Sequence, residues 1–227
     1  MAAEYCAAEI MKTVVSTEGF NDSLNATQIG NCIQQAFLTI DANLHLVPEM
    51  ATGQDHSGCT AICSFITPNH IIVANAGDSR SVLGKNQKTV PMSFDHKPFD
   101  ELEKARIESA NGMVRNKRVN GDLAVSRALG DFVYKDRHDL TPMQQKVSPY
   151  PDIKIEERDG TEEFLVIACD GIWDVMSNDD LCQYIRYLLS IGETDLGLVV
   201  EELLDHCLEL GSRDNMSAII VVRARYL

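Results

Sequence analysis

The sequence predicts an α+β domain in which an antiparallel sheet and its helices come from separate blocks of the chain. Between residues 58 and 84, short β-forming runs follow one another with only tight turns between them, which is typical of antiparallel strands. Helical periodicity stands before and after these runs and does not alternate with each strand, as it would around a parallel sheet. Because the chain has 227 residues, of which 44% are hydrophobic, we expect a single domain over residues 1–227.

The N-terminal block predicts two helices. Apolar residues recur at helical spacing over residues 2–15, and this pattern stops near Gly19. A second helix is expected over about 25–46. Its apolar positions form one stripe, which consists of Ile29, Ile33, Phe37, Ile40 and Leu44.

A meander of three strands follows the second helix. Residues 59–66 and 70–76 form a predicted hairpin that turns at Thr67-Pro68-Asn69. Gly77-Asp78 is a second tight connection and leads into a strand over 80–84. The order predicts antiparallel pairing.

The second half of the chain begins with a short charged helix over 100–111. Residues 116–151 are rich in Gly, Pro and polar residues, so about 98–151 is expected to form a surface excursion of the kind that carries binding loops. The remaining elements are two strands at 152–156 and 164–169, two helices at 177–190 and 195–210, and a last strand at 218–224.

Three acidic segments carry most of the functional signal: GDSR at 77–80, ACDGIWD at 168–174 and SRDNMS at 212–217. Asp170 ends one apolar run, and Asp214 precedes another. Carboxylates at the ends of strands can converge in space, and their oxygens suit a hard cation such as Mg²⁺ or Mn²⁺. Each aspartate alone would also fit an ordinary turn. Together they predict a metal-dependent enzyme that acts on phosphate groups.

Composition narrows the function classes. A net charge of −14 and a pI near 4.7 argue against nucleic acid and anionic membranes as partners, because both are bound by basic patches. No secretory signal is expected at the N-terminus, and no apolar run is long enough to span a membrane. No Walker or dinucleotide-type glycine loop is present either.

The cysteines predict a reducing compartment. They are odd in number, scattered and placed mostly within apolar runs, so we expect buried thiols in a cytoplasmic or nuclear protein. The seven are Cys6, Cys32, Cys59, Cys63, Cys169, Cys182 and Cys207.

In their amino-acid residues and in their order along the chain, several segments resemble the metal-dependent protein serine/threonine phosphatases of type 2C (PPM-type). The resemblance covers nearly all of residues 57–224. It rests on SGCTAI at Ser57, NAGDSRSVL at Asn75, DHKP at Asp95, VNGDLAVSRALGDFVYK at Val119, VSPYPDI at Val147, FLVIACDGIWDVMSNDDLC at Phe164 and GSRDNMS at Gly211.

The resemblance implies a sandwich of two antiparallel sheets flanked by helices, with a two-metal centre at one end. It implies hydrolysis of phosphoserine or phosphothreonine in proteins by metal-activated water. Asp170 and Asp214 match the ligands of the first metal, and Asp78 and Asp174 match acidic residues around a weaker third position. It also implies Mg²⁺ or Mn²⁺ as cofactor and phosphoproteins as partners, and we expect a monomer, with 98–151 as a flap on the substrate side.

The sequence departs from this pattern at its start. The family's Asp-Gly-His-Gly turn, which supplies a bridging ligand and a proposed general acid, is absent, and so is an earlier arginine that binds the substrate phosphate. The expectation is therefore an N-terminally truncated domain that lacks its first strands. Loss of ligands that contact the metal directly should cost more than the ~10–100-fold typical of outer-shell losses, so impaired activity is predicted.

Two functions remain open: a phosphatase, and a catalytically inactive phosphatase-like module that binds phosphoproteins.

For four further residues, the sequence predicts a structural role. Trp173 is expected in the core, Arg80 in a local salt bridge and His96 in the turn before Pro98. A structural or flap role is favoured for Ser126 over that of a nucleophile.

Overall fold

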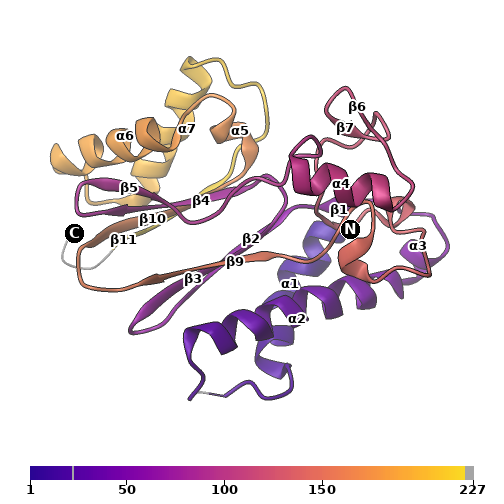
Figure 1. The fold of residues 1–227 in the computed structure, drawn as a ribbon. Helices are drawn as coiled ribbons and strands as arrows, with labels where there is room; N and C mark the ends of the chain where they lie inside the picture. The colour runs from indigo at the N-terminus through magenta and orange to yellow at the C-terminus, as the bar shows by residue number, and fades with distance from the viewer. Residues whose placement is uncertain (22, 223–227) are drawn as a thin grey trace.

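Two antiparallel sheets lie face to face, and helices cover the outer side of each (Figure 1). The structure is a computed structural model and describes residues 1–21 and 23–222. The α+β class and the two-sheet sandwich implied by the resemblance are both confirmed.

Four strands form the larger sheet, in the order β11-β10-β4-β5. They are β4 (Arg80–Lys85), β5 (Lys88–Pro91), β10 (Glu162–Ala168) and β11 (Ala218–Val222). The smaller sheet has the order β2-β3-β9. Its strands are β2 (Ala61–Ile66), β3 (His70–Ala76) and β9 (Asp152–Glu157).

Strand β3 shows how alternation builds the layers. Ile71 and Val73 point between the sheets, where they join a buried cluster with Leu83 and Leu165 of the other sheet. Ile72, between them in sequence, joins the cluster that faces the N-terminal helices. Because successive side chains of a strand point to opposite faces, a strand that is apolar throughout can serve both layers.

Helices α1 (Ala2–Ser16) and α2 (Ala26–His45) cover the smaller sheet (Figure 1). Asn25 caps α2 through a reciprocal pair of bonds with Gln28, which satisfies backbone donors at the helix start. A short helix, α3 (Pro48–Ala51), follows.

Helices α6 (Asn178–Ser190) and α7 (Leu196–Glu209) cover the larger sheet, and α5 (Asp170–Trp173) leads into them. Ser177 caps α6 in a capping box with Asp180, as the sequence predicts.

The excursion over about 98–151, which connects β5 to β9 along the chain, has a small core of its own. It carries α4 (Glu101–Ser109), the ribbon β6–β7 (Val114–Arg115 and Arg118–Val119), β8 (Leu129–Gly130, paired with β1, Gly58–Cys59) and the 3₁₀ turns η1 (Phe132–Tyr134) and η2 (Pro142–Gln144). Its buried cluster consists of Ile107, Val119, Val125, Ala128, Tyr134 and Val147. These positions follow no helix or strand period, which is why the sequence suggests a surface segment without a core.

The boundaries of the predicted elements agree closely with those expected, and several further elements are present: α5, and within the excursion β6, β7, β8, η1 and η2. Helix α3 and strand β5 were not predicted either. The last predicted strand is β11 up to Val222, and its positions 223–224 lie outside the described residues.

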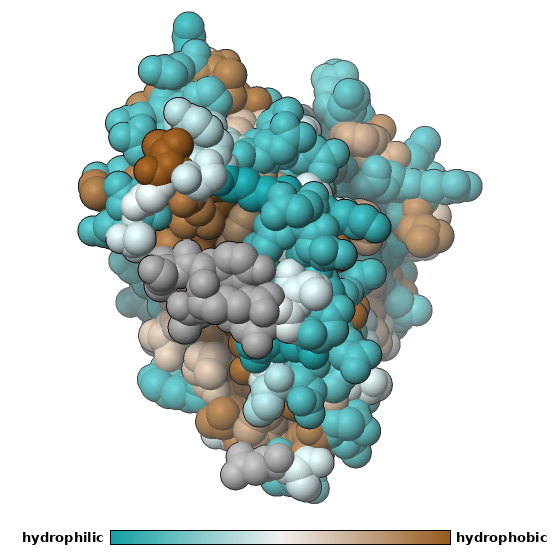
Figure 2. Space-filling view, turned by 90° about the vertical axis from the view of Figure 1, so that its left-hand side faces the viewer, coloured by the Kyte–Doolittle hydropathy of each residue, from teal (hydrophilic) through white to brown (hydrophobic). Residues whose placement is uncertain are grey.

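Hydrophilic residues predominate on the face seen in Figure 2, and apolar residues appear there as separate patches. This surface is consistent with the net charge of −14.

Candidate metal centre

Strand register brings three of the four candidate aspartates to one end of the larger sheet. Ala168 at the end of β10 pairs with Arg80 on one side and with Ala218 on the other. Asp78 lies two residues before Arg80, Asp170 two residues after Ala168, and Asp214 four residues before Ala218. The convergence that the sequence suggests therefore follows from the antiparallel pairing of β4, β10 and β11.

Helix α5 is fixed against the loop that carries Asp214. The Ser212 hydroxyl donates to the Gly171 carbonyl at 2.7 Å. A Cβ at Gly171 would lie 2.5 Å from the Asn215 carbonyl oxygen and 3.3 Å from the Asp214 Cβ, so only glycine permits this approach. Gly171 thus places the residues after Asp170 directly against the Asp214 turn.

Trp173 anchors the same helix in the core, as expected. Its side chain is buried, and Nε1 donates to the Ala168 carbonyl at 2.9 Å. Arg80 lies over the indole ring, 5.1 Å from its centre, and forms a two-point salt bridge with Asp95 at 2.8 and 2.9 Å. The local salt bridge predicted for Arg80 is therefore present.

The four aspartates differ in exposure and affect one another electrostatically. Asp78 is 5% exposed, Asp170 is half-buried, and Asp174 and Asp214 are exposed. Burial raises the pKa of Asp170, and the negative charges of the other three aspartates raise it further. A carboxylate whose ionised form is opposed by three others lies where a cation is stabilising.

Lys97 supplies positive charge at this place. Its Nζ lies 2.6 Å from Asp78 Oδ2 and 3.9 Å from Asp95 Oδ2. The same ammonium lowers the pKa of Asp170, against the larger effects of burial and the other aspartates. Lys97 belongs to the DHKP segment, but nothing in that segment predicts its ion pair with Asp78.

The turn that carries Asp78 is held by a histidine. Gly77 has φ of +125°, and its N–H donates to His96 Nδ1 at 3.1 Å. Since Nδ1 accepts, the ring proton is on Nε2, which donates to Asp152 Oδ2 at 3.2 Å. His96 thus connects the Asp78 turn to strand β9, a longer reach than the local turn role expected for it.

Ser126 and Arg127 of the excursion, which could suggest a nucleophilic site, instead form buried structural contacts. Ser126 is fully buried and donates to Glu103. Arg127 forms ion pairs with Glu103 at 2.8 Å and with Asp152 at 2.7 Å. These contacts agree with the structural role favoured for Ser126.

The donor set suits a hard divalent cation in charge and chemistry. All four candidates offer carboxylate oxygens, and the raised pKa of Asp170 reflects an excess of negative charge. Within the described part of the chain, however, no three His, Cys, Asp or Glu side chains are grouped so that they could hold a metal ion. Mg²⁺ commonly keeps several waters and uses only one or two carboxylates, so the residues fit such an ion as partial ligands.

Comparison with protein families gives an independent result. The family model described as "Protein phosphatase 2C" matches residues 1–216. "Protein phosphatase 1A" of Homo sapiens is 44% identical over 223 residues, and the match covers 96% of this chain and 58% of that protein. "Protein phosphatase 1B" of Homo sapiens is 41% identical over 227 residues, covering 96% of this chain and 47% of that protein. The chain thus spans about half the length of these relatives.

Solved structures share the fold. A "C. elegans sex determining protein" superposes with a TM-score of 0.81 at 24% identity, covering 96% of this chain and 52% of that one. A phosphatase from Toxoplasma gondii gives a TM-score of 0.78 at 23% identity, covering 97% and 80%. Among residues 1–21 and 23–222, no helix combines the length and apolar character that crossing a membrane requires.

Proposed function

Because the chain belongs to the protein phosphatase 2C family, we propose that it acts in the hydrolysis of phosphoserine and phosphothreonine in proteins. The observation that carries the proposal is the convergence of Asp78, Asp170 and Asp214 through the register of three neighbouring strands. Phosphorylated proteins are accordingly the proposed partners. A monomer in the cytoplasm or nucleus is part of the same proposal.

Asp170 and Asp214 are the proposed ligands of a divalent cation, Mg²⁺ or Mn²⁺, with Asp78 and Asp174 at a weaker position beside it. Such an ion, when bound, offsets charge on phosphoryl oxygens and makes a water molecule more acidic. The chain's own residues prepare the place: Gly171 admits the Asp214 turn, and His96 holds the turn of Asp78. Lys97 keeps the buried Asp78 carboxylate charge-balanced.

The 227-residue polypeptide is proposed to be a slow catalyst by itself. Its sequence contains no Asp-Gly-His-Gly segment, and no group of three ligands is formed among its described residues. An ion held by two carboxylates is bound more weakly than one held by a complete set. We expect turnover at least ~10–100-fold below that of a phosphatase with a complete metal centre.

A second function, a phosphoprotein-binding module without catalysis, is favoured by one observation. The Lys97 ammonium already contacts Asp78, so part of the acidic cluster is neutralised without a metal. In that case the excursion over about 98–151 would supply the binding surface. The two functions differ in whether phosphate is released from the bound phosphoprotein.

The test is Mn²⁺-dependent release of phosphate from a phosphothreonine peptide by the purified chain. Asp170→Asn should abolish the release, whereas Asp205→Asn, at an exposed position of α7, should leave it unchanged. Phosphate release that persists in Asp170→Asn would contradict the proposed ligand. No release by a folded wild-type chain that still binds the peptide would favour the binding module.

A further inference from the structure

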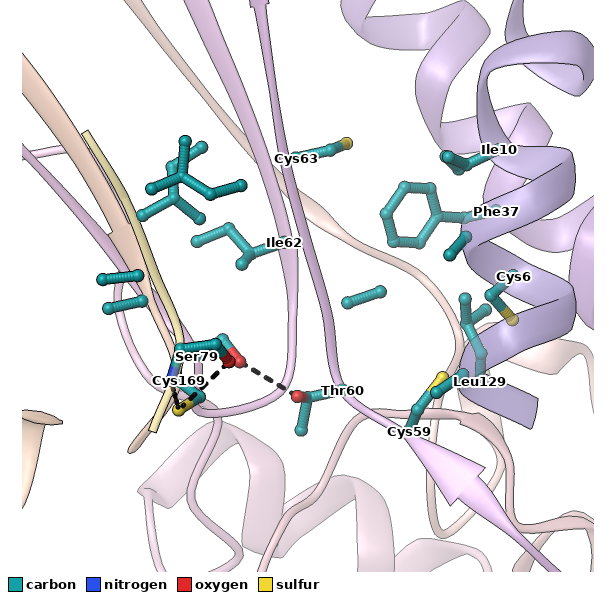
Figure 3. A pocket seen from close by; sticks show the side chains of 18 residues that line it. Cys6, Ile10, Phe37, Cys59, Thr60, Ile62, Cys63, Ser79, Leu129 and Cys169 are labelled. Carbon is teal, nitrogen blue, oxygen red and sulfur yellow. Dashed lines mark hydrogen bonds between the residues drawn. The ribbon is translucent and has the colours of Figure 1, made fainter. Parts of the chain in front are cut away.

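Two cysteines meet where helix α1 reaches the sheet. Cys6 lies in the second turn of α1 and is 6% exposed, and Cys59 is the last residue of β1 and is half-buried. Both line a cavity of about 300 Å³ whose wall is formed by α1, Phe37 and strands of both sheets (Figure 3). Cys6 belongs to the buried cluster beneath the N-terminal helices, Cys59 packs against that cluster, and Figure 3 shows the two side chains near each other at one end of the cavity.

The backbone around the pair is held on both sides. At the start of α1, the Ala2 N–H donates to the Ser57 hydroxyl at 3.2 Å, two residues before Cys59. Cys59 itself pairs with Leu129 of β8. A disulfide requires two cysteines whose side chains already face each other at short range. Cys6 lies one helical turn beyond Ala2, and Cys59 lies two residues beyond Ser57, so the Ala2–Ser57 contact holds the two cysteines on neighbouring stretches of α1 and β1.

The two thiols are not equivalent. The neighbouring Cys6 thiol lowers the pKa of Cys59, and the Lys135 ammonium lowers it as well, against burial and nearby carboxylates. The pKa of Cys6 is raised by the Cys59 thiol and by burial. Cys59 is therefore the sulfur that ionises first, and the thiolate is the reactive form.

A third cysteine on the same cavity wall provides a contrast. Burial raises the pKa of Cys63 to about 12, so its thiolate is scarce at neutral pH. Cys63 lies in strand β2, two residues beyond its start. Reactivity toward oxidants is thus expected at Cys59 and not at its neighbour.

We propose that Cys6 and Cys59 form a reversible modification site, at which a peroxide converts the two thiols into a disulfide. The site is separate from the proposed phosphatase activity, because its chemistry requires neither a metal nor a phosphorylated substrate.

The reaction has two balanced steps when hydrogen peroxide is the oxidant. The Cys59 thiolate attacks one peroxide oxygen, an S–O bond forms, the O–O bond breaks, and hydroxide leaves and is protonated to water. The Cys6 sulfur then attacks the sulfenic sulfur of Cys59, the S–S bond forms, the S–O bond breaks, and the Cys6 proton leaves in a second water. Two thiols lose two electrons, and one peroxide becomes two waters.

The disulfide would close a loop over residues 6–59, which contains α2 and α3. It would fix the helical layer to β1 and constrain the unfolded chain. We expect oxidation to raise Tm by at least about 5 °C, and a dithiol reductant to reverse the shift.

Peptide mapping of the folded chain after hydrogen peroxide treatment tests the proposal. Trypsin leaves Cys6 on residues 1–12, and Cys32, Cys59 and Cys63 together on residues 13–80. Mass spectrometry should find these two peptides joined in the wild type. The disulfide-linked peptide pair should persist in Cys63→Ser and disappear in Cys59→Ser.

The peptide map can either support or overturn the proposed disulfide. Absence of the joined peptides in the oxidised wild type, or their persistence in Cys59→Ser, overturns the proposal. Because Cys59→Ser could fail to fold, the wild type is also labelled with iodoacetamide before oxidation. Cys59 should react at least about ten-fold faster than Cys63. Equal rates, or a faster Cys63, overturn the proposal without any variant.

Discussion

At the scale of single residues, Lys97 is the cation that the fold itself provides to the acidic cluster. Replacing it by glutamine removes one positive charge next to Asp78, where Nζ and Oδ2 are 2.6 Å apart. Loss of this repulsion, about 1 kcal/mol for charges several ångströms apart near a surface, should tighten Mn²⁺ binding by roughly 3–10-fold. Calorimetric titration of Lys97→Gln checks this.

The control for this charge effect is Lys104→Gln. Lys104 is half-exposed on α4 and pairs only loosely with Glu108, at 3.8 Å. Its Mn²⁺ affinity should match that of the wild type. Unchanged or weaker Mn²⁺ binding by Lys97→Gln would show that the ammonium does not compete at this site.

Asp152 gives the molecule an acid-sensitive contact. The hydrogen bond from His96 and the charge of Arg127 lower the pKa of Asp152 to about 2. A depressed carboxyl pKa stabilises the fold above the unfolded value of about 3.9, and the stabilisation is lost as pH falls toward about 2. Since 62% of the Asp152 side chain is exposed, the effect should be about 1 kcal/mol or less.

Urea unfolding of Asp152→Asn and the wild type measures this contribution. The free energies of unfolding should differ at pH 6 and converge as pH is lowered from about 4 to about 2. A difference that stays constant over this range would mean that the charge of Asp152 is not responsible.

Among single residues, the sequence predicts best the positions of those that are placed by a neighbouring strand or helix. Asp170 and Asp78 follow strands directly, so their position at the sheet end follows from the predicted elements. Lys97 and His96 act on partners 19 residues away in the chain, and only the folded turn brings them together. Such side-chain pairs leave no period in a sequence, which is why they were not predicted.

At the scale of elements, the contact between α5 and the Asp214 loop depends on Gly171. In Gly171→Ala, the new Cβ would lie 2.5 Å from the Asn215 carbonyl oxygen, so the loop or the helix must shift. We expect a destabilisation of about 1–3 kcal/mol and weaker Mn²⁺ binding. Urea unfolding and metal titration of the same variant measure both.

Gly197→Ala is a suitable comparison, because its Cβ would meet only the Asp195 carboxylate, at 3.0 Å, within helix α7. This variant should retain its Mn²⁺ affinity. Wild-type stability in Gly171→Ala would contradict the close packing of α5 on the loop.

Elements with a strong local signal were predicted, and weakly marked ones were not. Capping residues mark the starts of α2 and α6, and both helices begin where expected. Strand β5 was missed because its turn uses Asn86 and Gln87 with φ of 50° and 60°, without the glycine usual for such turns. Pro91 at its end weakens the strand pattern further, although an edge strand tolerates it.

At the scale of the whole molecule, the α+β class follows from the order of elements, whereas the pairing of strands does not. Residues of β4 lie about 80 positions before their partners in β10, and β11 lies about 55 positions after. No local pattern specifies such partners, and the resemblance to a known family supplied the two-sheet arrangement. The metal centre depends on this same long-range register.

Calorimetric titration of Mn²⁺ into the folded chain and into the double variant Asp170→Asn/Asp214→Asn tests most directly whether these two aspartates are metal ligands. The wild type should bind Mn²⁺ saturably, and the double variant should lose binding by at least about 100-fold, because both proposed ligands become neutral. Asp205→Asn should bind as the wild type does. Equal binding by the wild type and the double variant would contradict the assignment of Asp170 and Asp214 as metal ligands.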